Sequence, residues 1–369
     1  MKSQSPIRTT EALARALGLS RWTVSRALNG SPGVSAATAA RVRNEAARRG
    51  FHPNALARGL RSGQSDAVGV ILPDPEDYHL GTKLRLLREA LEARGRIVVW
   101  QVTNGSASGE EEALARFCAM RIFQVVSFAS RLDRSAVLES TFAASGGRIL
   151  AVDPLGNLSG VEVDRAHAMW MAGRHLIECG CRGLCVVGLD PESSYSPQRM
   201  KGLRRITRSG MLKKPPLMLF ADPRDGVFET GRALGRRYAA LGANRPGGVI
   251  ALSDRVAIMM NAELARHGLT APVHYRIVGY DASAMAAVAN PELTTIDPRP
   301  EQVISRVVDE LLSNGSLPEK VIRITPRLVI RESTAGGQHA GRRPISKLSA
   351  QRLRDNGFER GAHQGRLSP

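Results

Sequence analysis

The chain has 369 residues, of which 43% are hydrophobic and 23% are charged. This length suits two or three units with a sizeable buried core, and the composition is typical of a globular protein rather than a fibrous or disordered one. No apolar run approaches the roughly 20 residues that span a bilayer, and no apolar segment typical of a secretory signal follows Met1. We therefore expect a cytoplasmic protein without a membrane partner.

The charge is unevenly distributed along the chain. Fifty-two Lys and Arg residues against 34 Asp and Glu residues leave a net charge of +18. Half of this excess lies in residues 1–65, where only Glu11 and Glu45 are acidic. Such a segment is typical of a module that binds a polyanion, and its alanine-rich composition disfavours a membrane-surface helix. The basic residues of the segment are Lys2, Arg8, Arg15, Arg21, Arg26, Arg41, Arg43, Arg48, Arg49, Arg58 and Arg61.

Residues 1–52 lack strand patterns and predict a head of three short helices. Thr9 can cap a first helix, Thr10–Leu17, and Gly18 then permits a tight turn. Ser20 is well placed to cap the helix that follows. Two helices joined by a short turn, the second with an outward polar face, form the geometry that enters a DNA major groove.

The second helix, Arg21–Leu28, is expected to bury Val24 and Leu28 one turn apart. Arg26 can bind the O6 and N7 atoms of guanine, whereas the bulk of Trp22 suits a thymine methyl group or a sugar. The alternative is an alanine-rich helical bundle with a solvated basic face. The side chains expected to face outward are Arg21, Trp22, Ser25 and Arg26. The side chains that can donate to phosphate oxygens are Ser20, Thr23, Ser25 and Asn29.

Residues 53–65 form a polar connector, and from Val68 onward short β-branched runs alternate with amphipathic helices. This alternation predicts right-handed βαβ crossovers in two doubly wound parallel sheets, one before about residue 155 and one after it. A late segment, Leu293–Ile296, could cross back to the first sheet. The expected strands are Val68–Leu72, Ile97–Gln101, Gln124–Phe128, Arg148–Val152, Gly183–Val187, Leu217–Phe220, Val249–Leu252 and Arg276–Gly279. The expected helices are Leu80–Arg94, Glu110–Met120, Ala166–Cys179, Arg199–Arg208, Glu229–Leu241, Asp254–His267 and Gln302–Ser313.

Three of the four cysteines, Cys179, Cys181 and Cys185, lie close in sequence to His175. A metal site is one interpretation. Their spacing is not a C-x-x-C pair, however, and Cys185 belongs to an apolar strand pattern, so buried reduced thiols are the simpler interpretation. We expect no metal and no cofactor.

Three stretches carry a resemblance to a known family. They are TVSRALNG at Thr23–Gly30, VSAAT at Val34–Thr38 and GFHPNALARGL at Gly50–Leu60. Together they closely resemble the lactose-repressor (LacI) family of bacterial transcription regulators, and the resemblance continues over about residues 9–334. It implies an α/β protein with a helix-turn-helix head at 1–52, a hinge and linker at 53–65, and a two-lobed, periplasmic-binding-protein-like body at 66–334. The basic tail at 335–369 lies outside the resemblance.

The resemblance assigns base reading to Arg21, Trp22 and Arg26, and Trp22 replaces the polar residue usual in the family. It also implies a hinge helix at Asn54–Arg61 that pairs with a second copy on DNA. Leu60 then stands at the position that is wedged into the minor groove. The alternative is that Leu56 and Leu60 attach the linker to the body. The expected DNA-binding residues are Thr9, Ser20, Arg21, Trp22, Thr23, Ser25, Arg26, Asn29, Asn54, Ala57 and Leu60.

The resemblance further implies an effector, a sugar or related metabolite, in the cleft between the lobes. Ser253 stands where the family usually has asparagine, and Gly226 where an aromatic residue is common. Capping of helices or strand ends is the structural alternative for Asp153 and Asp281. The expected effector-binding residues are Tyr78, Asp153, Arg199, Ser253 and Asp281.

The function that follows is a sequence-specific transcription regulator, expected to be a repressor, that binds a near-palindromic DNA operator as a homodimer or a tetramer. A doubly wound enzyme with a basic N-terminal extension is the competing class. No G-x-G-x-x-G, Walker loop, G-x-S-x-G or H-E-x-x-H motif is present in the sequence, so we expect no catalysis. A plain ligand-binding protein is disfavoured because the head is attached and no export signal is visible.

Overall fold

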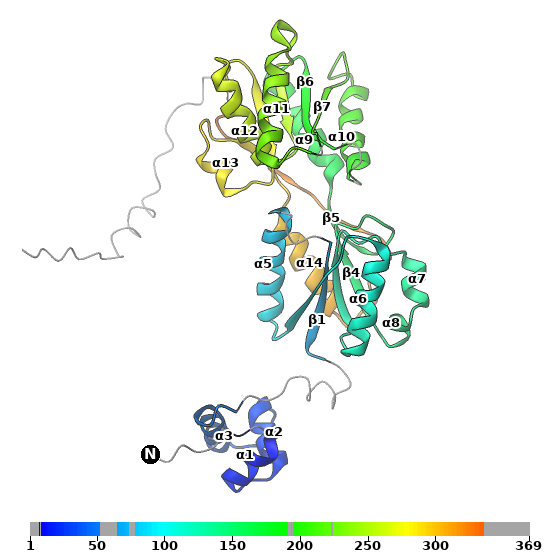
Figure 1. Ribbon diagram of the computed structural model, residues 1–369, viewed down its shortest axis with the longest axis vertical. Helices are drawn as coiled ribbons and strands as arrows, with labels where there is room; N and C mark the ends of the chain where they lie inside the picture. The colour runs from blue at the N-terminus through cyan, green and yellow to red at the C-terminus, as the bar shows by residue number, and fades with distance from the viewer. Residues whose placement is uncertain are drawn as a thin grey trace, which may run out of the picture. The chain divides into compact units, whose positions relative to one another are not determined.

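The computed structural model describes residue 7 and residues 9–51, 65–73, 78–190, 193, 195–222 and 224–335. Its contacts divide the chain into unit 1, Met1–Asp164 with Arg299–Thr325, and unit 2, Arg165–Pro298 with Pro326–Pro369. Unit 1 includes the small helical head and a first sheet, and unit 2 contains a second sheet (Figure 1). No helix in the described part of the chain is long and apolar enough to cross a membrane.

The head consists of α1 (Thr10–Leu17), α2 (Arg21–Asn29) and α3 (Ala36–Arg48). Each helix begins at a hydroxyl cap: the side chains of Thr9, Ser20 and Ser35 accept hydrogen bonds from the backbone N–H groups of Ala12, Thr23 and Thr38. Gly18 and Gly30 end α1 and α2 in the left-handed conformation that glycine adopts without strain. The three helices enclose a small apolar core formed by Ile7, Leu13, Ala14, Leu17, Val24, Ala27, Val42, Ala46 and Phe51.

Unit 1 contains a six-stranded parallel sheet in the order β11-β5-β4-β3-β1-β2. Helices α5 and α14 cover one face and α6 to α8 cover the other, so apolar side chains of β1 alternate between two cores (Figure 1). The strands are β1 (Ala67–Leu72), β2 (Ile97–Val102), β3 (Gln124–Phe128), β4 (Arg148–Val152), β5 (Gly160–Val163) and β11 (Ile322–Ile324). The helices are α5 (Tyr78–Glu92), α6 (Ala107–Ala119), α7 (Arg134–Glu139), α8 (Thr141–Ala144) and α14 (Pro300–Leu312).

Unit 2 repeats this layered design with the strand order β12-β10-β9-β8-β6-β7, in which only β12 is antiparallel. Helices α9 and α10 pack on one face, and α11 and α12 pack on the other. The strands are β6 (Leu184–Leu189), β7 (Leu217–Phe220), β8 (Gly248–Ala251), β9 (Arg276–Tyr280), β10 (Thr294–Asp297) and β12 (Arg327–Val329). The helices are α9 (Arg165–Glu178), α10 (Ser196–Arg208), α11 (Val227–Ala239), the 3-10 turn Gly242–Asn244, α12 (Asp254–Arg266) and α13 (Ala284–Val288).

One expected pairing is wrong. The sequence suggested that Leu293–Ile296 crosses back to the first sheet, but β10 pairs in parallel with β9 inside unit 2. The chain returns to unit 1 only afterwards, through α14 and β11, and β11 pairs with β5. The four residues Leu-Thr-Thr-Ile do not reveal their sheet, because sheet membership depends on pairing with distant segments rather than on the strand's own residues.

Candidate nucleic-acid interface and effector site

The exposed face of α2 carries the side chains expected to read bases. Val24 and Ala27 are buried in the head core, whereas Arg21 is exposed and Trp22 is 59% exposed. Ala27 takes the fully buried place that the sequence suggested for Leu28, which is only half-buried. The core therefore fixes α2 so that its first turn presents Arg21 and Trp22 to solvent.

Arg26 is held more firmly than its sequence position suggests. Its Nε donates to the backbone oxygen of Pro32 at 2.6 Å, and its Nη2 donates to the same oxygen. Its Cζ also lies 4.8 Å from the centre of the Trp22 ring, within cation–π range. Gly33, at φ 100°, leaves room for this packing, because a Cβ there would lie 3.3 Å from the Arg26 Nε. Arg26, Trp22 and the turn after α2 thus form one contact group in the DNA-free head.

The hydroxyl groups at the start of α2 can cap the helix and still donate to phosphate. Ser20 Oγ accepts from the Thr23 backbone N–H at 3.0 Å and lies 2.9 Å from Thr23 Oγ1. One of the two hydroxyls uses its proton in that contact, so the other retains a proton for an outside acceptor. Thr9 Oγ1 likewise accepts from Ala12 N at 3.1 Å and keeps its own proton. Ser25 is half-buried and Asn29 is exposed.

Both carboxylates of the head are engaged by arginines. Glu11 pairs with Arg15 at 3.4 Å, and Glu45 pairs with Arg48 and Arg49 at 2.7 Å each. The hydrogen bonds from Arg48 and Arg49 lower the pKa of Glu45. Within the described residues Arg21 and Arg43 form no ion pair, so their charge is available to a polyanion. The expected hinge contacts Asn54, Ala57 and Leu60 lie outside the described residues.

Asp153 stands at the carboxyl end of β4 in unit 1. The residue is buried and adopts φ 52°, a conformation that is uncommon for a side chain other than glycine. Lys83 on α5 forms an ion pair with Asp153 Oδ2. Sequence reasoning did not find Lys83, because 70 residues separate it from Asp153 and no local pattern links them. Tyr78 begins α5, but its side chain lies outside the described residues.

Unit 2 places Arg199 near Asp281, as expected for two residues of one site. Burial lowers the pKa of the Arg199 guanidinium, whereas the neighbouring Tyr280 and Asp281 act to raise it. Its Nε is buried and has no hydrogen-bond partner among the described residues. A buried donor of this kind is rare in folded proteins and often marks a place where a ligand or water completes the hydrogen bonding.

Two further residues surround Arg199 that sequence reasoning missed. Arg165 opens α9, and its Cζ lies 4.0 Å from the centre of the Tyr195 ring. Both residues influence the pKa of Arg199, so all three occupy the same neighbourhood. The signal that could have found Arg165 is its position just after β5, a four-residue strand that the sequence pattern did not resolve.

Ser253 and Asp254 have structural roles at the same edge of the sheet. Ser253 caps α12 by accepting from Val256 N at 3.2 Å. Asp254 is buried; it accepts from Thr295 Oγ1 at 2.6 Å and from Ser283 N at 2.7 Å, and burial raises its pKa. Asp281 follows β9 at φ 115°, and its backbone N–H donates to Ile296 O. Capping therefore accounts for Ser253 without a ligand, whereas it does not account for Arg199.

Gly226 stands before the first residue of α11, and a Cβ at this position would meet no atom within 4 Å. The first side-chain carbon of a larger residue would therefore meet no described atom at this position.

The cysteine cluster does not gather metal ligands in the described residues, where no three His, Cys, Asp or Glu side chains are placed to hold an ion. His175 Nε2 instead lies 2.9 Å from Thr334 Oγ1 and 3.7 Å from Cys179 Sγ. Burial raises the pKa of Cys185 to about 12, so its thiol is protonated at neutral pH.

A helix-turn-helix head joined to two parallel-sheet units defines a DNA-binding transcription regulator with a periplasmic-binding-protein-like body. The model of the bacterial regulatory proteins of the lacI family matches residues 11–54, and that of the periplasmic binding protein-like domain matches residues 174–334. The chain is thus similar to the LacI family of transcription regulators.

Relatives of known function are similar in sequence or in fold to most of this chain. The HTH-type transcriptional regulator GalR of Escherichia coli K12 is 24% identical over 339 residues, which cover 89% of this chain and 96% of GalR. A Lac repressor dimer bound to operator and the anti-inducer ONPF shares the fold with a TM-score of 0.75 and 19% identity, covering 90% of this chain and all of that one. A CelR–cellobiose complex gives a TM-score of 0.59 and 24% identity, covering 88% of this chain and 99% of that one. These relatives are regulators or ligand complexes of regulators.

Proposed function

We propose that this protein is a repressor that binds a near-palindromic operator as a homodimer and is regulated by a sugar or a sugar-derived acid. It acts by binding rather than by catalysis. The observation that carries the proposal is the head: a buried core fixes α2 so that Arg21, Trp22 and Arg26 share the surface that similarity to this family assigns to base reading.

A dimer follows from the size of the head. One short helix reads only a few base pairs, which is too little to distinguish one site in a genome, whereas two heads in successive major grooves double the contacts. No carboxylate among the described residues pairs with Arg21 or Arg43, and the hydroxyls of Thr9 and of Ser20 or Thr23 keep a proton there. These groups support phosphate contacts that set the register. The GalR and Lac repressor relatives support the same class of activity.

The effector is proposed to bind Arg199 at the carboxyl edge of the unit 2 sheet. The unpartnered Nε of Arg199 needs an acceptor, which a hydroxyl, a carboxylate or a phosphate oxygen supplies. Asp281 can accept hydrogen bonds from sugar hydroxyls, and the Tyr195 ring with its stacked Arg165 offers a flat surface. The presence of Arg165 beside Arg199 favours an effector with an acidic group over a neutral sugar.

Asp153 and Lys83 form a second polar pair at the carboxyl edge of the unit 1 sheet. The expectation that one effector uses both edges stays a prediction. Under it, the effector would favour one of two arrangements of the units, and that preference would decide whether the hinge segments can pair on DNA.

The experiment has two stages. The full-length protein first selects duplexes from a random library, and the enriched sequence should contain two inverted half-sites. Neutral sugars, uronic acids and sugar phosphates are then screened for release of that duplex, with Arg199→Met as the variant that should bind DNA but not respond. Selection of no sequence, or of a single unrepeated half-site, would contradict the dimeric operator. An unchanged response of Arg199→Met would place the effector elsewhere.

A further inference from the structure

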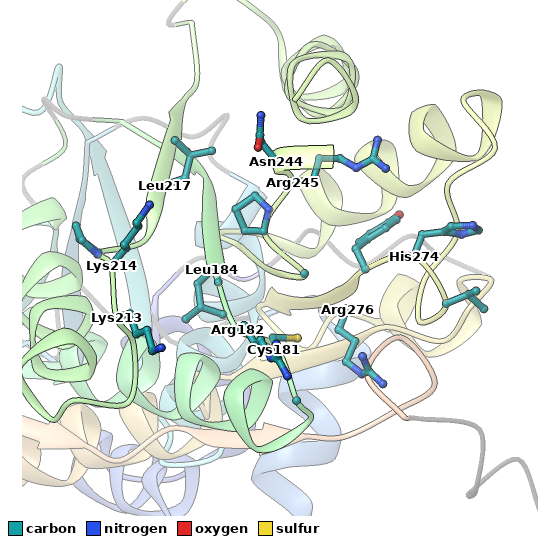
Figure 2. Close-up of a pocket in the computed structure, with 17 residues that line it drawn as sticks. Cys181, Arg182, Leu184, Lys213, Lys214, Leu217, Asn244, Arg245, His274 and Arg276 are labelled. Carbon is teal, nitrogen blue, oxygen red and sulfur yellow. The ribbon is translucent and has the colours of Figure 1, made fainter. Parts of the chain in front are cut away.

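Unit 2 contains a pocket at the edge of its sheet opposite to Arg199. The pocket lies among the segments that precede β6, β7, β8 and β9, at the amino ends of these parallel strands (Figure 2). Its volume is about 720 Å³, within the range of sites that hold small organic molecules. All of its lining residues lie between Gly180 and Arg276, so unit 2 forms it alone.

The lining is strongly cationic. No aspartate or glutamate is among the lining residues, and within the described part of the chain none of the lining cations forms an ion pair with a carboxylate. Figure 2 shows Lys213 and Lys214 on one side of the pocket, Arg245, His274 and Arg276 on the other, and Arg182 between them next to Cys181. The basic side chains that line the pocket are Arg182, Lys213, Lys214, Arg245, His274 and Arg276.

Two of these side chains have donors that meet no acceptor within the described part of the chain. Arg276 Nε is buried and has no hydrogen-bond partner in the described structure. His274 Nδ1 accepts from the Thr270 backbone N–H at 3.0 Å, so the neutral ring carries its proton on Nε2, where it can donate. Arg276 also lies near the Cys181 thiol of the lining: burial raises the pKa of this thiol, and the charge of Arg276 acts to lower it.

The pocket also has an apolar part. Leu184, Pro215, Leu217, Pro246 and Val273 contribute to its wall, and Leu217 and Val273 are exposed. An inorganic ion would leave this surface in contact with water, whereas an organic anion would cover it. The wall therefore favours a ligand that joins an apolar or ring portion to its charged groups.

Charge attraction within the protein does not explain the cluster. Helix carboxyl termini point toward this edge and favour cations in their last turns, yet Lys213 and Lys214 lie beyond the end of α10 and Arg276 begins a strand. The sequence after Thr334 is itself basic, with seven Lys or Arg residues against Asp355 and Glu359. It has the wrong sign to neutralise the pocket.

We propose that this amino-edge pocket is a second ligand site, which binds a small organic anion carrying at least two phosphate or carboxylate groups. Lys213 and Lys214 supply mobile point charges from one side, and Arg276 and His274 supply directed hydrogen bonds from the other. The site is independent of Arg199 and would allow a second metabolite to act on the same regulator.

The test is isothermal titration of the full-length protein with pyrophosphate, magnesium-free ATP and citrate, with adenosine as the uncharged probe. We expect ATP or citrate to bind more tightly than pyrophosphate, and adenosine not to bind. ATP binding without citrate binding would identify phosphate as the anionic group, and the converse would identify carboxylate. Affinity should fall as the salt concentration rises.

The key variant is Lys213→Gln/Lys214→Gln, which changes two exposed side chains and should fold normally. It should bind about tenfold more weakly, equivalent to about 1.4 kcal/mol. Arg276→Gln should weaken binding to a similar degree, and thermal melting of both variants checks the fold. The matched control is Arg204→Gln/Arg232→Gln, which removes two exposed charges of unit 2 outside the pocket and should bind within twofold of the wild type.

Four outcomes would overturn the proposal. The first is failure of all three anions to bind the wild type. The second is equal loss of affinity in the pocket variant and its matched control, which would indicate a general charge effect. The third is anion binding that Arg199→Met abolishes while the pocket variants retain it, since the anion would then occupy the effector site. If only duplex DNA loses affinity in the pocket variant, the cluster is a DNA contact and the small-anion site is likewise refuted.

Discussion

Arg26 offers the sharpest test of base reading. Arg26→Gln removes the guanidinium that donates twice to Pro32 O and lies 4.8 Å from the Trp22 ring centre. In the DNA-free head these contacts lie at a partly exposed surface, where a hydrogen bond and a cation–π contact each contribute roughly 0.5–1 kcal/mol. The variant head should therefore lose only about 1 kcal/mol of stability, because its buried core is unchanged.

The effect on operator binding should be larger. A bidentate arginine–guanine contact discriminates between bases by about 1–3 kcal/mol. A dimer contains two such heads, so the expected loss is about 2–6 kcal/mol, or roughly 30-fold to more than 10,000-fold in Kd. Binding to unrelated duplexes rests on phosphate contacts and should change little, apart from the loss of one positive charge per head.

Fluorescence anisotropy on the selected operator and on a scrambled duplex measures the operator affinity and the affinity for unrelated DNA in one titration series. Arg43→Gln is the matched control, since it removes an exposed arginine of α3 that forms no ion pair in the described residues. It should weaken both duplexes by a similar small factor and reduce the salt slope. If Arg26→Gln weakens both duplexes equally, Arg26 contacts phosphate and the base-reading argument is wrong.

The remaining predictions concern the two units. Arg199→Met should keep operator affinity and lose effector-induced release by anisotropy; full release would refute its role. Lys83→Met leaves Asp153 as a buried charge and should lower the free energy of unfolding by about 3 kcal/mol in urea denaturation. The double variant Lys83→Met/Asp153→Asn should lose less, and equal losses in the two variants would contradict the pairing. Burial lowers the pKa of His175 below 6.5, so the unfolded chain binds more protons and stability should fall as pH drops below 6.5; an equally steep fall in His175→Gln would exclude this histidine.

The regular elements of the body could be predicted because each buried strand is a short β-branched run. Gln124–Phe128 and Arg148–Val152 coincide with β3 and β4, and both lie in the middle of their sheet. Strand β5 and strand β11 were missed, since three or four residues carry no period and β11 forms only by pairing with β5, far away in the sequence. The sheet to which Leu293–Ile296 belongs was misjudged for a related reason, because sheet membership is a long-range property.

The residues of the candidate site could likewise be predicted only in part. Motif positions place Arg199 and Asp281 close together, and the structure brings them into one neighbourhood. The partners Lys83 and Arg165 are brought in by folding from distant segments, which a single sequence does not reveal. Ser253 accepts from Val256 N as the cap of α12 and keeps its own hydroxyl proton, so its predicted effector contact stays a prediction.

The pairing of Trp22 with Arg26 changes how the unusual tryptophan of α2 should be understood. The two residues lie four positions apart, so their side chains share one face of the helix, and the indole ring holds the guanidinium from one side while Pro32 O holds it from the other. A polar residue at position 22 would remove the ring contact and leave Arg26 held by Pro32 O alone. With Trp22 in place the guanidinium is ordered before DNA arrives, which lowers the entropy lost on binding, but it must also exchange its Pro32 contacts for base contacts. We therefore expect operator preference to be a joint property of the pair, and we expect that the half-site of a relative with a polar residue at this position does not transfer to this protein.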